Sequence, residues 1–194
     1  MRRMALGLLL LGSALAGGDA GLAWRSLSPT GGWQPAAAVV APTPCPALNL
    51  PATWEVSASA FADVTGDGSP ECVLTLWRPW RNWPIHRWSA GPTPITANRD
   101  AAGRSAHVAV LRPLPGGAYR EVWVGSALYR PVRALSVRPG GTLVTLEVSY
   151  AAPSAPAQTL SEWHWTSFGF DLVRRVPVRA TALGVDARGW PAVR

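Results

Sequence analysis

The stretch from Asp63 to Glu71 has the residue types and spacing to hold a hard cation. Its sequence, Asp-Val-Thr-Gly-Asp-Gly-Ser-Pro-Glu, puts oxygen-bearing side chains at loop positions 1, 3, 5 and 9 and a glycine at position 6. Calcium loops use alternate side chains and one backbone carbonyl as ligands, and the glycine allows a sharp turn. These residues predict one Ca²⁺ site, and the alternative is a turn with solvated acids. The candidate ligands are Asp63, Thr65, Asp67, Ser69 through its carbonyl oxygen, and Glu71.

A second candidate lies directly downstream, where residues 77–88 contain four tryptophans and three arginines. Prolines at 79 and 84 exclude a regular helix or a central strand. We favour arginines stacked on indoles within the protein, which would fasten a long loop to the sheets. A platform for sugar rings and a segment touching anionic lipid are the alternatives. The candidate ligand or partner surface comprises Trp77, Arg78, Trp80, Arg81, Trp83, Arg87 and Trp88.

Residues for catalysis are scarce. The sequence has no Gly-x-Ser-x-Gly, no recognisable Cys–His pairing and no glycine-rich phosphate loop. The histidines, His86, His107 and His164, lack metal-ligand spacing. Glutamates could supply the carboxylate pair of a glycoside hydrolase, but the sequence brings no two together. These are Glu55, Glu121, Glu147 and Glu162. We therefore expect no enzyme.

Short runs rich in β-branched and aromatic residues recur along the chain, each bounded by glycine or proline. This is the pattern of strands and turns, and the many prolines leave little room for helices. The runs are Cys72 to Trp77, Ala106 to Leu111, Glu121 to Val124, Thr142 to Val148 and Leu160 to Trp165. The predicted fold class is all-β.

A weak internal repeat accompanies these runs. Apolar strand starts followed by glycine turns begin at Ala60, Ala134 and Ala182, 74 and then 48 residues apart. Such spacing is typical of one small sheet or propeller blade per repeat. Because a closed propeller usually needs more blades, we expect a partial, propeller-like stack of small antiparallel sheets, with a β-sandwich as the alternative.

The Asp63–Glu71 loop resembles the calcium loop of FG-GAP (VCBS-like) repeats, the blades of integrin-α-type propellers. It is not an EF-hand, because position 12 is Leu74 instead of a bidentate glutamate. The resemblance implies an exported repeat protein of an uncharacterised bacterial type. Thr65 stands where the family usually has a carboxylate, which lowers the expected affinity. The other two copies have lost the acids, apart from Asp186.

The N-terminus has the features of a secretory signal peptide. Two arginines precede an apolar run, and Ala14-Leu15-Ala16 forms an A-x-A cleavage site. We expect residues 1–16 to be a signal peptide, 17–51 a Pro/Gly-rich disordered or extended linker, and 52–194 a single β-repeat domain. The alternative is an uncleaved N-terminal anchor. The expected location is secreted or cell-envelope.

The two cysteines, Cys45 and Cys72, could form a disulfide in such a compartment. The alternative is two buried free thiols, since Cys72 lies in an apolar run.

The charge of the chain limits the classes of partner that we expect. The formal charge is +7 from 18 basic residues, all of them arginine, against 11 acids. Because the arginines are scattered, we expect no nucleic-acid partner. We expect membrane contact only through an uncleaved signal segment or the Trp/Arg segment. The sequence thus predicts an exported, non-enzymatic binding or scaffold module with an unidentified protein or polysaccharide partner. The alternative is a carbohydrate-active protein that uses the Trp/Arg segment.

Overall fold

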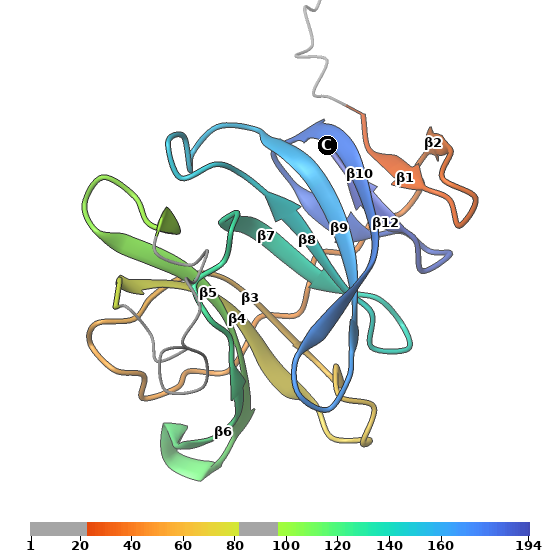
Figure 1. The fold of residues 1–194 in the computed structure, drawn as a ribbon. Helices are drawn as coiled ribbons and strands as arrows, with labels where there is room; N and C mark the ends of the chain where they lie inside the picture. The colour runs from red at the N-terminus through yellow and green to blue at the C-terminus, as the bar shows by residue number, and fades with distance from the viewer. Residues whose placement is uncertain (1–22, 82–96) are drawn as a thin grey trace, which may run out of the picture.

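The computed structural model describes residues 23–81 and 97–194, which form three four-stranded antiparallel sheets, none of them closed (Figure 1). The all-β prediction is confirmed. Sheet I has the order β3-β4-β5-β6, sheet II β10-β9-β8-β7 and sheet III β11-β12-β1-β2. The strands are β1 (Arg25–Leu27), β2 (Trp33–Pro35), β3 (Glu55–Ala62), β4 (Glu71–Pro79), β5 (Arg104–Pro113), β6 (Tyr119–Val124), β7 (Val132–Val137), β8 (Leu143–Glu147), β9 (Ala157–Trp165), β10 (Phe170–Ala180), β11 (Leu183–Val185) and β12 (Pro191–Val193). A short 3-10 turn, η2 (Pro115–Gly117), precedes β6.

Sheet II lies between the other two sheets. On one face of β8, Leu143 packs in a cluster with Val73 and Val110 of sheet I. On the opposite face, Leu146 packs in a cluster with Val193 of sheet III. Because side chains alternate across a strand, β8 is buried on both faces, and its apolar residues Leu143, Val144 and Leu146 are shared between them.

The three copies of the weak repeat occupy one hairpin in each sheet. Residues 60–68 run from β3 into the turn before β4, and residues 134–141 run from β7 into the turn before β8. Residues 182–189 run from the start of β11 into the turn before β12. Each copy therefore lies on a hairpin that contains an edge strand of its sheet, and the copies share an apolar start and a glycine turn.

These three turns lie together. Arg138 donates through Nε to the carbonyl oxygen of Gly189 at 2.7 Å, which joins the turns of sheets II and III. Gly141 has φ +82°, and a Cβ added there would lie 3.1 Å from the carbonyl oxygen of Asp63 in the turn of sheet I. The close approach of the turns therefore requires glycine at position 141.

Sheet III joins both ends of the described chain. Strands β1 and β2 lie inside residues 17–51, the range expected to be a linker, and β1 pairs with the C-terminal strand β12. Leu27 is fully buried. From residue 23 onward this range is thus part of the fold. Its two strands are three residues long, and β1 lies between β2 and the C-terminal strand β12, so local sequence carries little sign of them.

The expected signal peptide, residues 1–16, lies outside the described ranges. In those ranges no helix is long and apolar enough to cross a membrane.

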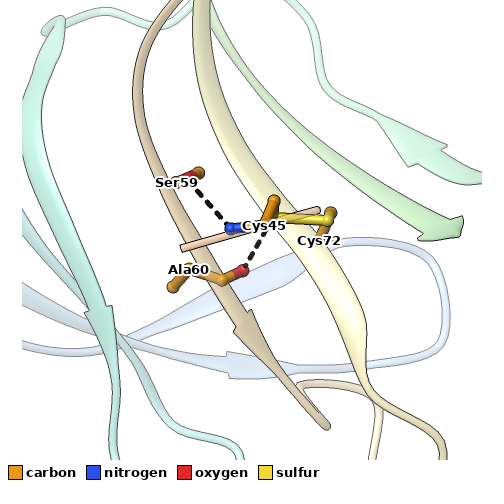
Figure 2. The surroundings of a disulfide bond; sticks show 4 residues. All are labelled: Cys45, Ser59, Ala60 and Cys72. Carbon is orange, nitrogen blue, oxygen red and sulfur yellow. Dashed lines mark hydrogen bonds between the residues drawn. A yellow bond between two sulfur atoms is a disulfide. The ribbon is translucent and has the colours of Figure 1, made fainter. Parts of the chain in front are cut away.

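A disulfide joins Cys45 to Cys72 (Figure 2). Cys72 is fully buried on the face of sheet I that points away from sheet II. Cys45 belongs to the segment before β3, its N–H donates to Ser59 Oγ at 3.3 Å, and its Sγ lies 3.4 Å from the carbonyl oxygen of Ala60. Leu48 and Leu50 of the same segment pack on this face. The bond therefore fastens a covering segment to sheet I.

We expect Cys45→Ala to lower the free energy of unfolding by about 3.5 kcal/mol, the chain-entropy value for closing a loop between residues 27 apart. Urea unfolding of the oxidised protein and the variant measures the difference. A thiol reductant should lower the stability of the parent protein by a similar amount and leave the variant unchanged. Equal stabilities of the oxidised parent and the variant would contradict a stabilising role for the bond.

Candidate metal-binding loop and arginine–tryptophan contacts

The Asp63–Glu71 loop connects β3 to β4 and is closed by its own acids. Asp63 accepts hydrogen bonds from the backbone N–H groups of Gly66 at 2.7 Å and Gly68 at 2.8 Å. Both glycines have positive φ, +76° and +85°. Asp67 Oδ1 accepts the N–H of Ser69 at 2.9 Å. Glycines at these two positions allow the backbone to wrap around Asp63.

Glu71 is the first residue of β4, and its side chain is completely buried. Its Oε2 accepts the N–H groups of Val64 at 3.2 Å and Thr65 at 3.4 Å. Its Oε1 accepts the Thr65 hydroxyl at 3.1 Å. The buried carboxylate is therefore held by the loop that it closes.

The structure brings together the three acids that the sequence selected. Oxygens of Asp63, Asp67 and Glu71 all lie within 4.8 Å of one another, so this group could hold a metal ion. Thr65 adds a hydroxyl next to Glu71, and Ser69 contributes its N–H to Asp67. Carboxylate and hydroxyl oxygens are the donors that a hard cation prefers, so the donor set fits one.

Sequence reasoning missed Arg112, which lies against the same acids. Its NH2 group donates to Asp67 Oδ2 at 2.6 Å and to Glu71 Oε1. The hydrogen bond from Arg112 lowers the pKa of Asp67, and the hydrogen bonds to both acids raise the pKa of Arg112. Arg112 lies at the end of β5, where its neighbour Leu111 pairs with Cys72. Only the strand register shows that these positions meet.

The beginning of the Trp/Arg segment packs into the protein. Trp77 is only 8% exposed, so it is part of the core and not of the expected surface. Its ring meets Tyr150 edge to face at 5.6 Å, and the Arg104 guanidinium lies 5.5 Å from its centre. Trp77 belongs to β4, and the pairing of β4 with β5 places Arg104 close to it.

The next residues form further arginine–tryptophan pairs. Arg78 lies 5.7 Å from the centre of the Trp54 ring, and Arg99 lies 4.6 Å from that of Trp80. Arg81 is exposed. Trp83, Arg87 and Trp88 lie outside the described residues. In the described part, the segment thus forms the internal cation–π contacts that we favoured.

His107 of β5 lies beside Arg78 at a hollow of about 210 Å³. Its Nδ1 donates to the carbonyl oxygen of Gly125 at 2.9 Å, so its Nε2 accepts the Ser105 hydroxyl at 2.7 Å. Burial is the main cause that lowers the pKa of His107 to about 4, and the nearby charge of Arg78 acts in the same direction. Burial also lowers the pKa of Arg78. Among the described residues that line this hollow, none is acidic.

The four glutamates considered for hydrolysis do not converge. Glu55 pairs with Arg104 at 2.7 Å, and Glu121 is exposed. Val144 and Glu147 are three residues apart in β8, so their side chains lie on opposite faces of sheet II. Glu162 pairs with Val144 across the strands and shares its face, so Glu147 and Glu162 lie on opposite faces.

We expect His107 to make folding pH-dependent. An unfolded histidine takes up a proton near pH 6.5, whereas folded His107 stays neutral down to about pH 4. The contribution of neutral His107 to the free energy of unfolding is therefore complete above pH 6.5. As the pH falls to 4, this free energy decreases by up to about 3 kcal/mol. Urea unfolding at pH 7.5 and pH 4 measures this loss. His107→Gln should shrink it, whereas the same change at the exposed His164 should not. An unchanged pH profile in His107→Gln would refute the assignment.

Comparison with known proteins assigns this chain to no family. No protein-family model matches the sequence, and no curated protein matches it. The function must therefore be argued from the residues and contacts described above.

Proposed function

We propose that the protein is an exported, non-enzymatic binding or scaffold module of the FG-GAP-like repeat type. The observation that carries this proposal is the placement of the three repeat copies on one hairpin in each sheet, with their turns in contact. In a propeller-like stack each repeat is one small sheet. Three sheets, instead of the two of a sandwich, favour such a stack.

The contacts of the Trp/Arg segment favour binding or scaffolding over hydrolysis of a carbohydrate. A hydrolase would need two carboxylates facing one cleft beside these tryptophans. The described lining of the hollow next to Arg78 holds arginines and His107 instead. Trp77 is buried, which removes one ring from a sugar platform. A partner, whether protein or polysaccharide, would have to bind elsewhere or through the rest of the segment.

Export is supported by two features. The first 16 residues have the composition of a cleavable signal, and the Cys45–Cys72 disulfide suits an oxidising compartment. We place the protein in the cell envelope or outside the cell.

A Ca²⁺ ion would be a second positive charge for the acids of the loop, in addition to Arg112. Asp63, Asp67 and Glu71 carry three negative charges, of which Arg112 neutralises one when it binds. A Ca²⁺ ion in the loop would rigidify the turn and supply no chemistry. It would use the three acids, the Thr65 hydroxyl and the Ser69 carbonyl as ligands, and it would compete with Arg112. Weak sites of this kind suit extracellular calcium, with Kd values of about 10⁻⁴ to 10⁻³ M.

We expect 10 mM Ca²⁺ to raise the melting temperature above that in EGTA by roughly 4–8 °C, the equivalent of about 2 kcal/mol of ligand binding. Asp67→Ala should abolish the rise. Arg112→Gln should lower the melting temperature in EGTA, because Glu71 loses its guanidinium, and should enlarge the rise, because the competing cation is gone. Thermal unfolding followed by circular dichroism measures all of these shifts.

The exposed Asp171, substituted by alanine, is the matched control and should keep the full calcium effect. If neither the parent protein nor Arg112→Gln responds to Ca²⁺, the loop is an arginine-closed turn and the calcium proposal fails.

Export has its own test. We expect the full-length chain, produced in a bacterium, to be recovered outside the cytoplasm. Its first residue should be Gly17, and its disulfide should be formed. Intact-mass measurement of fractionated cells reports both features. Replacing Ala14 and Ala16 by glutamate should block processing. Unprocessed protein that stays in the cytoplasm would overturn the export proposal.

A further inference from the structure

A cavity of about 160 Å³ lies between sheets I and II, and no residue of the calcium loop lines it. Val108, Trp123 and Leu128 line it from the side of sheet I, and Leu143, Trp163 and Phe170 line it from sheet II. An apolar protein cavity of about 150 Å³ can hold one benzene ring. This cavity therefore has room for a single ring.

The aromatic walls of the cavity are fixed before any ligand binds. Trp123 meets Phe170 edge to face at 5.6 Å, and both rings also contact Trp165. The indole N–H of Trp163 donates to Thr145 Oγ1 at 2.9 Å. Walls held in this way lose little conformational freedom when a ligand binds between them.

The mouth of the cavity is cationic. Of the described residues that line it, only Tyr129, Arg130 and Arg175 are exposed, so the cavity meets solvent at these side chains. Deeper in the cavity, Val108 and Leu143 are buried. A ligand with one apolar and one polar end would therefore place its polar end beside the arginines.

Neighbouring positions on β9 hold both guanidinium groups of the mouth. Arg130 donates to Thr159 Oγ1 at 3.0 Å. Arg175 donates through Nε to Ser161 Oγ, also at 3.0 Å. Because side chains alternate along a strand, Thr159, Ser161 and Trp163 follow one another on the same face of β9. The Arg175 guanidinium lies 5.7 Å from the centre of the Trp163 ring, so the cations adjoin the aromatic walls directly.

Charge selects the polar group of the ligand. The one acid in the described lining is Glu147, and Arg175 already pairs with it at 3.2 Å. Arg130 binds a neutral hydroxyl and, within the described ranges, forms no ion pair. Its guanidinium has five N–H donors, and a carboxylate that accepts from it gains charge-assisted hydrogen bonds. A cationic ligand would instead meet a net positive charge.

We propose that this cavity binds a small aromatic carboxylate. The ring fills the space between Trp123, Trp163 and Phe170. The carboxylate accepts hydrogen bonds from Arg130 at the mouth, with Arg175 beside it. This site rests neither on the repeat assignment nor on calcium, so the experiment is done in EGTA.

Benzoate and benzamide are matched probes, because they have nearly the same shape and differ in charge. We expect benzoate to bind the full-length protein with a Kd in the millimolar range, at least about tenfold tighter than benzamide. Two-dimensional ¹H–¹⁵N spectra follow the titrations, with the Trp163 indole N–H as the reporter inside the cavity. Benzylamine, which is positively charged at neutral pH, should bind more weakly than benzamide. Acetate, which has no ring, should leave the Trp163 signal unshifted.

Variants separate recognition of the carboxylate from the cavity itself. Arg130→Gln should reduce the affinity for benzoate to near that for benzamide, and it changes an exposed side chain that the core does not need. Arg179→Gln is the matched control, because it removes an exposed arginine of β10 that does not line the cavity. It should preserve the preference for benzoate. Leu128→Trp should fill the cavity and abolish binding of both probes.

Four results would overturn the proposal. Equal affinities for benzoate and benzamide in the parent protein would show that no carboxylate is recognised. Tighter binding of benzylamine than of benzoate would show that the site prefers a cation. Undiminished benzoate binding by Arg130→Gln would show that this arginine does not hold the carboxylate. No shift of the Trp163 signal with benzoate up to its solubility would show that the cavity takes no ring.

Discussion

Four carboxylates are buried in the described part of the chain, and arginine compensates each of them. The pairs are Glu71 with Arg112 in sheet I, Glu147 with Arg175 in sheet II, Glu162 with Arg138 and Arg174 next to it, and Asp186 with Arg188 in sheet III. An isolated ionised carboxylate is too costly to bury, and removing one partner of a buried pair is strongly destabilising. The pairs therefore restrict which strands and turns can pack together.

Two of these guanidinium groups, those of Arg138 and Arg174, also join one sheet to another. Arg174 donates to Glu162 at 2.6 Å and to the carbonyl oxygen of Ser28 at 2.9 Å, which links sheet II to the β1–β2 turn. Asp186 joins the β11–β12 turn to β1, because Ser26 Oγ donates to it at 2.7 Å. Burial raises the pKa of Asp186, but the hydrogen bonds that it accepts outweigh this and lower it to about 2. A planar guanidinium presents separate donors in fixed directions, whereas lysine offers one flexible charge. A chain whose basic residues are all arginine is well suited to these contacts between sheets.

Features of the fold could be predicted from the sequence where neighbouring residues determine them, and could not where pairing with a distant segment determines them. Strands such as β4 and β8 are buried on both faces, so their apolar runs are visible in the sequence. Strand β10 was not predicted, because it is the edge of sheet II, where its arginines and Pro177 are tolerated. Strands β1 and β2 were missed because each is three residues long, and because β1 completes its pairing with β12 at the opposite end of the described chain. The acids of the loop were found, but Arg112 depends on a strand register that the sequence does not state.

A motif identifies residue types in local order, but it does not state which of their atoms already have hydrogen-bond partners. In the loop, every carboxylate oxygen of Asp63, Asp67 and Glu71 already accepts a hydrogen bond, so a cation must displace a bound partner. One of these partners, Arg112, comes from outside the loop and reaches Asp67 and Glu71 from β5. Competition between arginine and a cation therefore arises only when β4 and β5 pair, so no local pattern in the sequence could reveal it.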